Sequence, residues 1–156
     1  MSDELPLEIE RKYLLSEMPR LPKPYRRLRV DQGYVPGQKL RERVRRIREG
    51  AETRYYRTLK FGRGVSRTEI EEETTAEVFR ALWRVTLGKR VRKRRYVVPD
   101  GARCWEIDRF SDRDLVLAEI ELEDPDEEIR FPPWLARCLV REVTDEPEYG
   151  NFRLAR

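Results

Sequence analysis

The chain has 156 residues, of which 41% are charged and 38% hydrophobic, and its formal net charge is +4. The length suits one domain with its own core, and the near balance of acids and bases is unlike that of a simple basic arm for nucleic acid. Three Trp, seven Tyr and five Phe indicate a folded chain rather than a disordered one. We therefore expect a single domain over residues 1–156.

The cysteine and histidine content limits the possible chemistry. Cys104 and Cys138 lie far apart and the chain has no histidine, so neither structural zinc nor histidine-based catalysis is expected. A bound metal would depend on carboxylates and water, which suit Mg²⁺ or Mn²⁺. No apolar run has the length of a membrane span, and charged residues within 8–12 interrupt any signal-peptide core. These features predict a cytoplasmic protein.

Alternating apolar and polar residues predict short strands along most of the chain. The predicted strands cover residues 7–14, 27–35, 40–48, 53–61, 67–73, 90–98, 103–110 and 115–123. Turn-like sequences separate several of them, namely Phe61-Gly62-Arg63-Gly64, Pro99-Asp100-Gly101 and Ser111-Asp112-Arg113-Asp114. Short links of this kind favour antiparallel neighbours.

Two helices are expected outside the strands, around residues 75–87 and 132–139. For the first helix, Thr74 and Glu77 predict a capping box, and the helix should end near Gly88. Its apolar stripe consists of Val78, Phe79, Leu82 and Trp83. The second helix should begin at Pro132-Pro133-Trp134, because proline is tolerated in a first helical turn. Its apolar face would be Trp134, Leu135, Cys138 and Leu139. The two cysteines and Trp83, Trp105 and Trp134 are expected to be packing residues.

Same-sign charged pairs occur near the middle of many predicted strands. Two residues separated by one other lie on the same face of a strand. The pairs are Glu8/Glu10, Arg46/Arg48, Glu69/Glu71, Lys93/Arg95, Glu106/Asp108 and Glu119/Glu121. Like charges at neighbouring positions repel each other unless opposite charges face them, and the acidic and basic strands could supply that opposition. One explanation is a closed barrel with these pairs inside and the apolar sides outside, against the helices.

The interior of such a barrel cannot be dry. Burial of an ion costs several kcal/mol, and about a dozen charges would exceed a domain stability of ~5–15 kcal/mol. We therefore expect the interior to hold water or a charged ligand. Lysine and arginine bind phosphoryl oxygens while carboxylates bind cations, so a polyanion accompanied by a divalent metal fits this set.

The segment Glu8-Ile9-Glu10-Arg11-Lys12-Tyr13 resembles the N-terminal Glu-x-Glu-x-Lys signature of the CYTH or triphosphate tunnel metalloenzyme family. The similarity continues in chain order through Gln32-Gly33-Tyr34, Arg46-Ile47-Arg48, Thr58-Leu59-Lys60, Arg67-Thr68-Glu69-Ile70-Glu71, Lys93-Arg94-Arg95-Tyr96, Glu106-Ile107-Asp108, Glu119-Ile120-Glu121, Glu142-Val143-Thr144, Tyr149 and Asn151. The chain is most similar to the short bacterial inorganic triphosphatase type. The resemblance implies a mainly β, α+β fold: an eight-stranded antiparallel closed barrel, or tunnel, that cleaves a triphosphate with Mg²⁺ or Mn²⁺.

The resemblance also implies a role for each matching residue. The implied substrate-binding residues are Lys12, Arg46, Arg48, Lys60, Arg67, Lys93 and Arg95. The implied metal ligands are Glu8, Glu10, Glu69, Glu71, Glu119 and Glu121. The residues expected to act most directly in catalysis are Lys12, Lys93, Glu119 and Glu121. Asp108 and Tyr34 are expected to face the tunnel without an assigned role.

The arginines of residues 40–48 leave two alternatives, because Arg43 and Arg45 cannot share a strand face with Arg46 and Arg48. We choose Arg46 and Arg48 because they flank Ile47 and precede the Thr58-Leu59-Lys60 segment at nearly the family spacing. The alternative pair is Arg43 and Arg45.

These features together predict metal-dependent hydrolysis of a short triphosphate, with inorganic tripolyphosphate cleaved to pyrophosphate and phosphate by direct attack of water. A thiamine triphosphatase, a nucleoside triphosphatase or an adenylate cyclase remains an alternative, because a fold does not fix its substrate. The basic runs 41–48 and 90–95 also allow a non-catalytic module that binds polyphosphate or nucleic acid, and surface ion-pair networks are a third possibility. We expect a small triphosphate as partner, no nucleic acid or membrane, and a monomer or homodimer.

Overall fold

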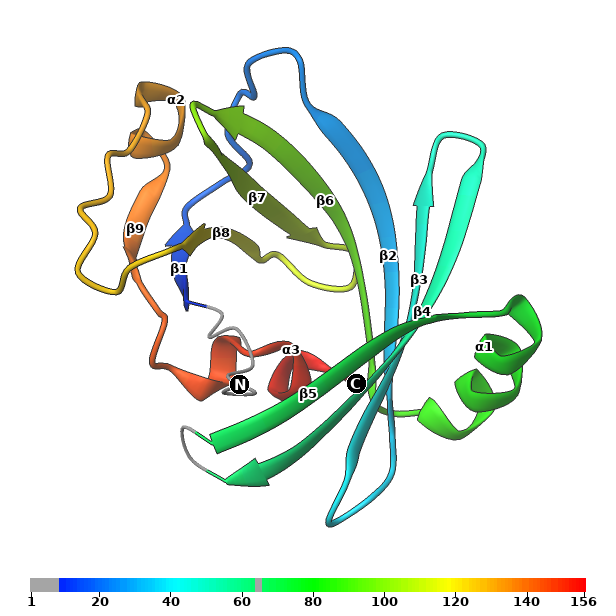
Figure 1. Cartoon of the computed structure of the whole chain (residues 1–156). Helices are drawn as coiled ribbons and strands as arrows, with labels where there is room; N and C mark the ends of the chain where they lie inside the picture. The colour runs from blue at the N-terminus through cyan, green and yellow to red at the C-terminus, as the bar shows by residue number, and fades with distance from the viewer. Residues whose placement is uncertain (1–8, 64–65) are drawn as a thin grey trace. The chain divides into compact units, whose positions relative to one another are not determined.

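The computed structural model describes the backbone of residues 9–63 and 66–156, and the side chains of these residues except 61–68 (Figure 1). Its strands are β1 (Ile9–Leu15), β2 (Arg26–Val35), β3 (Arg41–Glu49), β4 (Glu52–Arg63), β5 (Ser66–Thr74), β6 (Arg90–Asp100), β7 (Arg103–Phe110), β8 (Val116–Leu122) and β9 (Leu139–Glu142). Its helices are α1 (Ala76–Trp83), α2 (Pro133–Ala136) and α3 (Asn151–Leu154), with 3-10 turns at Arg84–Thr86 and Pro147–Tyr149. The mainly β, antiparallel fold class is as predicted.

The chain divides into two compact units, each assembled from segments distant in sequence. Unit 1 comprises Met1–Arg27 and Arg94–Tyr149, and unit 2 comprises Leu28–Lys93 and Gly150–Arg156. The boundary falls within β2 and β6, so each of these strands contributes residues to both units. The two units are described separately below.

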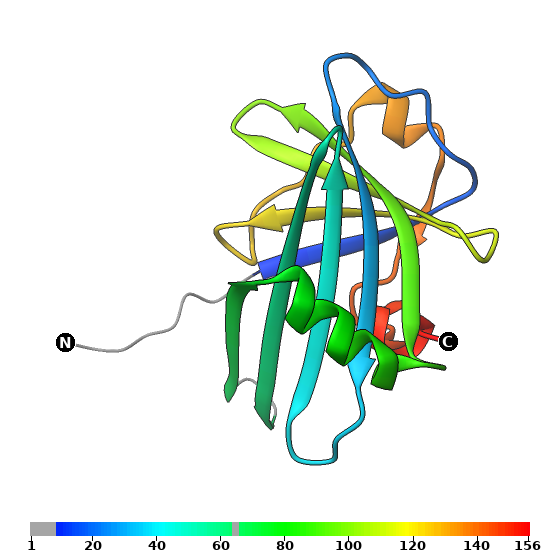
Figure 2. The same ribbon diagram turned by 90° about the vertical axis from the view of Figure 1, so that its right-hand side faces the viewer.

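In unit 2 the strand order is β5-β4-β3-β2-β6. Figure 2 shows α1 lying across one face of these strands. Phe79 of α1 is 2% exposed; its ring centroid lies 5.3 Å from that of Tyr55 and 5.2 Å from that of Trp83. Val44 of β3 is fully buried. The apolar contacts of unit 2 are therefore concentrated between the strands and α1, while the opposite strand face is polar.

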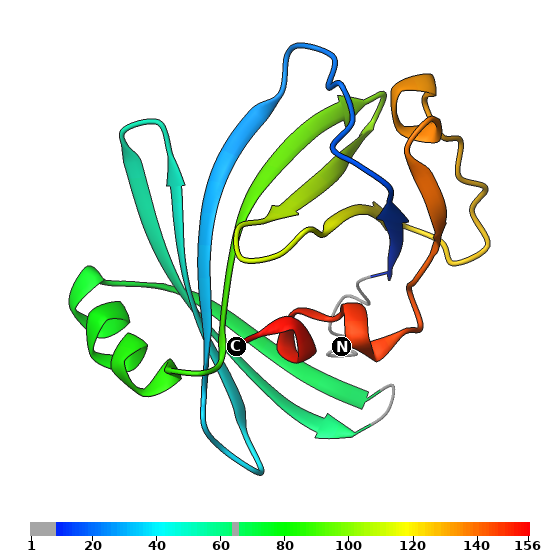
Figure 3. The same ribbon diagram turned by 180° about the vertical axis from the view of Figure 1, so that it is seen from behind.

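In unit 1 the strand order is β6-β7-β8-β1-β9, and Figure 3 shows β9 beside β1. One face carries a core of buried side chains that includes Tyr13, Trp105, Ile107, Ala118 and Ile120. Leu135 of α2 and the nearby Cys138 belong to the same core. As in unit 2, the apolar side of the strands is covered by helical residues and the other side is charged.

The structure corrects three local predictions of secondary structure. The expected 132–139 helix has a single turn, because Leu139 begins β9, which pairs with β1 and satisfies the backbone as a strand. The cap of α1 is Thr75, whose Oγ1 accepts a hydrogen bond from the Val78 N–H at 3.2 Å. Thr74 is not the cap because it is the last residue of β5, opposite Tyr55. The strand β4 extends to Arg63, so residues 61–63 belong to a strand and not to the predicted turn.

The described residues form nine strands rather than the eight predicted, because β9 was not predicted. No hydrogen-bonded pair joins the two end strands, β5 and β9, among the described residues, so closure of the barrel by hydrogen bonds is not part of this structure. No helix in the described part of the chain is long and apolar enough to cross a membrane. Cys138 is buried as predicted, whereas Cys104 is exposed.

Candidate functional site

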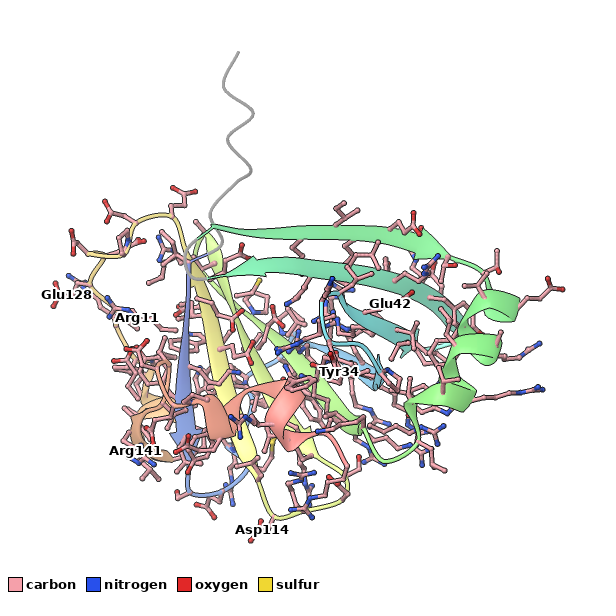
Figure 4. The ribbon with its side chains drawn as sticks, turned by 90° about the horizontal axis from the view of Figure 1, so that it is seen from below. Arg11, Tyr34, Glu42, Asp114, Glu128 and Arg141 are labelled. Carbon is pink, nitrogen blue, oxygen red and sulfur yellow. The ribbon has the colours of Figure 1, made fainter. Side chains whose placement is uncertain are left out.

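The polar face of unit 1 brings several of the predicted site residues together. The β1–β8 register places Glu10 opposite Glu121 and Lys12 opposite Glu119, and the β7–β8 register places Glu106 opposite Glu119. Directly opposite residues of antiparallel strands lie on the same face. Glu10, Glu106, Glu119 and Glu121 therefore share a strand face with Lys12. Arg11 points to the other side of β1, toward the loop that contains Glu128 (Figure 4), and donates to the carbonyl of Pro125.

Lys12 is held in place by two oxygen atoms. Its Nζ lies 3.3 Å from Glu119 Oε1 and donates a hydrogen bond to the Tyr149 carbonyl at 3.2 Å. The side chains of Lys12 and Glu119 are only 14% and 8% exposed. A poorly solvated, oriented ammonium group of this kind is suited to binding an anion.

Arg95 forms the most extensive ion-pair network of unit 1. Its Nε and Nη2 donate to the two oxygens of Asp108 at 2.7 and 2.8 Å, and it also pairs with Glu106 and with Glu119. Burial opposes the charge of Arg95, but Asp108, Glu106 and Glu119 outweigh this effect and hold its pKa well above the ordinary value. Asp108, which had no predicted role, thus fixes the orientation of Arg95.

The carboxyl groups of Glu10 and Glu119 lie close enough to share a proton. Glu10 is exposed as a residue, but its carboxyl group is largely surrounded by protein atoms. This burial raises the pKa of Glu10 to about 7, and the charge and the hydrogen bond of Glu119 contribute to the same shift. Lys12 and Arg95 oppose the shift. Two crowded carboxylates are typical of a place where a divalent cation replaces a shared proton.

The oxygen-rich donor set fits a hard cation such as Mg²⁺ or Mn²⁺, which binds carboxylates and water. Glu10, Glu119 and Glu121 supply these oxygens from two adjacent strands. The described residues contain no preformed group of three or more acidic, histidine or cysteine side chains in a metal-binding arrangement.

The polar face of unit 2 contains a row of opposite residues that crosses four strands. Tyr34 of β2 is opposite Arg43 of β3, which is opposite Thr58 of β4, which is opposite Glu71 of β5. Arg43 Nη2 donates to Thr58 Oγ1 at 3.0 Å and to Glu71 Oε2 at 3.4 Å, and it lies 3.8 Å from Glu69 Oε1. Among the described residues, the buried Nε of Arg43 has no hydrogen-bond partner. This row thus leaves a buried guanidinium donor unused.

Neighbouring residues of the same face fix further charged groups. Arg45 Nε donates to Gln32 Oε1 at 2.8 Å, and Gln32 Nε2 donates to the Tyr34 hydroxyl at 2.9 Å. Lys60 Nζ lies 3.3 Å from Glu69 Oε2. Burial and the nearby charge of Arg43 lower the pKa of Lys60.

Lys93 and Tyr34 are anchored by the C-terminal helix α3 of the same unit. The Lys93 side chain is buried, and its Nζ donates to Asn151 Oδ1 at 3.1 Å. Tyr34, labelled close to α3 in Figure 4, packs against Phe152 edge-on with ring centroids 5.2 Å apart. Burial raises the pKa of its hydroxyl. Tyr34 thus lies on the strand face that carries Arg43.

The choice of Arg46 and Arg48 for this face is wrong. Both side chains point to the α1 side of the strands, where they lie 2.9 and 3.0 Å from Asp31 Oδ2, and Arg46 also lies over the Phe79 ring. The alternative pair, Arg43 and Arg45, faces the same side as Lys60. A displacement of one residue along a strand reverses the face, so spacing to a residue on another strand was too weak a criterion.

Two predicted site residues cannot be placed, because Glu8 and the side chain of Arg67 lie outside the described residues. Sequence reasoning did not assign a role to Gln32, Thr58 or Asn151, which hold Arg45, Arg43 and Lys93. All three occur in the segments that resemble the family, and this resemblance could have identified them as site residues. Their contribution is to orient cationic groups.

The fold and these faces define a class: an antiparallel β protein whose strands pack apolar residues under helices and present ordered lysines, arginines and paired carboxylates on the other side. Residues 6–149 match the model of the CYTH domain family, and the chain belongs to this family. The family prediction is therefore confirmed.

Two proteins and one crystal structure show how far the similarity of this chain extends. The chain is 36% identical over 156 residues to an inorganic triphosphatase of Nitrosomonas europaea, with 95% of this chain and 96% of that protein covered. It is 34% identical over 96 residues to an inorganic triphosphatase of Acetivibrio thermocellus, with 60% and 59% covered. A crystal structure of an inorganic triphosphatase superposes with a TM-score of 0.69 at 30% identity, covering 96% of this chain and 94% of that chain.

Proposed function

We propose that this protein hydrolyses short triphosphates, and that its substrate is inorganic tripolyphosphate, cleaved to pyrophosphate and phosphate with Mg²⁺ or Mn²⁺. The observation that carries the proposal is the pair of crowded carboxyls, Glu10 and Glu119, next to the ordered ammonium of Lys12. Similarity to two proteins named inorganic triphosphatase supports the hydrolysis of triphosphates.

Glu10, Glu119 and Glu121 are the proposed ligands of the divalent cation. When bound, the cation would neutralise phosphoryl charge and lower the pKa of a coordinated water. Glu69, Glu71 and Glu8 are proposed as further acidic groups that bind cations, directly or through water. The described ones, Glu69 and Glu71, already lie beside Lys60 and Arg43.

Cationic side chains are the proposed ligands of the phosphoryl oxygens. Lys93 is buried, and the side chain of Lys12 is only 14% exposed. Tyr149, Glu119 and Asn151 orient the two lysines, so little conformational entropy is lost when they bind an anion. Arg43 replaces Arg46 and Arg48 in this role, because its Nε is buried without a partner among the described residues. Lys60, Arg95 and Arg67 complete the proposed set.

The proposed reaction is direct attack of water on a terminal phosphorus atom. The new bond joins the water oxygen to phosphorus, and the bond that breaks joins phosphorus to the bridging oxygen, which leaves on pyrophosphate. Glu119, whose carboxylate is oriented by Lys12, accepts a proton from the attacking water. Lysine and arginine stabilise the negative charge on the transferred group and on the leaving oxygen.

The experiment measures phosphate release from tripolyphosphate with Mg²⁺, with Mn²⁺ and with excess EDTA. Glu119→Gln and Lys93→Ala are the test variants, and exposed Glu128→Gln and Lys39→Ala are the matched controls. Both test variants should lose activity by about 100-fold or more, and both controls should retain it. Normal turnover in both test variants, or full activity in EDTA, would overturn the proposal.

A substrate panel distinguishes the related activities. Thiamine triphosphate, ATP and long-chain polyphosphate are compared with tripolyphosphate, and cyclic AMP is measured in the ATP reaction. A higher kcat/KM on an organic triphosphate would transfer the assignment to that substrate.

We further propose a cytoplasmic location and a monomer or homodimer, and light scattering would distinguish these two assemblies.

A further inference from the structure

An arginine cluster lies on the α1 side of unit 2, on the face opposite the proposed phosphoryl-binding residues. Asp31 of β2, which is 6% exposed, is surrounded by three guanidinium groups. Arg46 and Arg48 lie 2.9 and 3.0 Å from Asp31 Oδ2, and Arg92 lies 3.6 Å from Asp31 Oδ1. We call Arg29, Arg46, Arg48 and Arg92 the outer arginine cluster.

The outer arginine cluster carries more positive charge than Asp31 can neutralise. The β2–β3 register places Arg29 directly opposite Arg48, and like charges in this position repel each other. Arg92 also helps to lower the pKa of Arg90, after the larger effect of burial. Asp31 carries one negative charge, so it neutralises only one of these guanidinium groups. The additional arginines are explained if the face binds an anion.

The guanidinium groups retain donors that Asp31 does not use. Each arginine has five N–H bonds, and Asp31 accepts from Arg46 Nε and Nη2 and from Arg48 Nη2. Among the described residues, the buried Nε of Arg48 has no partner. The side chains of Arg46, Arg48 and Arg92 are 32%, 38% and 59% exposed, so a ligand in solution can reach them.

The position of the cluster favours an extended anion over a single phosphate. Its members lie on three adjacent strands, β3, β2 and β6. Neighbouring strands are about 4.8 Å apart, so the cluster extends roughly 10 Å across the sheet. Guanidinium groups bind phosphoryl oxygens in bidentate geometry. A chain of linked phosphates could therefore contact several members at once.

The aromatic residues of this face argue against nucleic acid as the ligand. Proteins that bind single strands stack bases on exposed rings. Tyr55, Phe79 and Trp83 instead pack against one another. Arg46 lies over Phe79 with its guanidinium carbon 5.5 Å from the ring centroid, and Arg90 lies over Trp83 at 4.3 Å. These contacts leave charge, rather than stacking surfaces, to recognise a ligand.

We propose that the outer arginine cluster is a binding site for linear inorganic polyphosphate, separate from the residues that hydrolyse tripolyphosphate. The site does not depend on the proposed function, because it lies on the other strand face and includes none of the proposed catalytic residues. Asp31 holds the guanidinium groups in place, and the surplus arginines bind the polyanion.

The test measures binding of end-labelled long-chain polyphosphate in EDTA at several salt concentrations. The variant Arg29→Gln/Arg92→Gln removes two cluster charges and leaves Arg46 and Arg48 on Asp31. The control is Arg54→Gln, an exposed arginine of the same unit that pairs with Glu52. The double variant should bind about tenfold more weakly than the control, with a shallower salt dependence. Its hydrolysis of tripolyphosphate should be unchanged.

Equal polyphosphate affinity in the double variant and the control would overturn the proposal. Equally tight binding of single-stranded DNA, lost in the same variant, would overturn the choice of inorganic polyphosphate. If the double variant does not fold, Arg92→Gln alone provides the test with an expected loss of about threefold, because this side chain is the most exposed of the three around Asp31. Failure of the wild-type protein to hydrolyse tripolyphosphate would affect only the proposed function.

Discussion

The carboxyl groups of Glu10 and Glu119 interact on the polar face of unit 1, where burial and the charge of Glu119 raise the pKa of Glu10 to about 7. The β1–β8 register explains the contact, because it places Lys12 opposite Glu119 and Glu10 opposite the next acid, Glu121. The Glu10 carboxyl therefore holds its proton to a higher pH than an ordinary glutamate does. Its proton competes with any cation that binds to the pair.

Cation affinity should consequently depend on pH. The affinity for Mn²⁺ or Mg²⁺ is expected to rise as the pH increases through about 7, because below this pH the cation must displace the Glu10 proton. Isothermal titration calorimetry in buffers of different ionisation enthalpy measures the protons released. Release of close to one proton at pH 6 and almost none at pH 8.5 is the expected result. A cation affinity that is independent of pH would contradict the proposed ligand role of Glu10.

The same pKa shift predicts the pH dependence of stability without metal. The folded-state pKa of Glu10 is raised above its ordinary value of 4.5, so its contribution is most favourable below pH 4.5 and is lost as the pH rises through about 7. The side chain in Glu10→Gln cannot ionise, so this variant does not lose that stability as the pH rises. Its melting temperature in EDTA should exceed that of the wild type at pH 8, and the difference should vanish near pH 4. A lower melting temperature for the variant at pH 8 would contradict the prediction.

The bidentate pair between Arg95 and Asp108 predicts a stability effect in unit 1. The Asp108 side chain is 1% exposed and accepts from both Nε and Nη2 of Arg95. Asp108→Asn should destabilise the protein by on the order of 3 kcal/mol, because a buried guanidinium loses its best partner. Urea denaturation measures the change. The control is Asp114→Asn, at an exposed loop position labelled in Figure 4, and it should have little effect.

The sequence predicted the strands and the acidic faces because both depend on local periodicity. All eight expected strands are present, and Glu10, Glu119 and Glu121 share a face because an alternation of two residues fixes the side of each strand. β9 was missed because its four residues, Leu139–Glu142, are separated from the helical turn of α2 by only two residues. Such a short edge strand is defined by its pairing with β1, and this long-range contact leaves little local signal.

The orientation of β3 was not predictable from its own sequence. Five arginines between residues 41 and 48 place positive charge on both faces, so local periodicity gives no preference. The face is decided by tertiary contacts: Asp31 attracts Arg46 and Arg48 to the α1 side, while Thr58 and Glu71 accept from Arg43 on the other. Asp31 was not recognised as a partner because it lies on a different strand.

This orientation separates the two groups of arginines in a kinetic experiment. Arg43→Ala should reduce kcat/KM for tripolyphosphate by on the order of 100-fold, because Arg43 has an unused buried donor on the face that carries Lys60. Arg46→Ala should change kcat/KM by less than about threefold, because Arg46 lies on the opposite face with Asp31. Arg43→Lys should keep more activity than Arg43→Ala, because lysine retains the positive charge but lacks the planar guanidinium group. Circular dichroism at the assay temperature verifies that each variant is folded. If Arg46→Ala lost more activity than Arg43→Ala, the original assignment of Arg46 would be favoured over the one derived from the strand register.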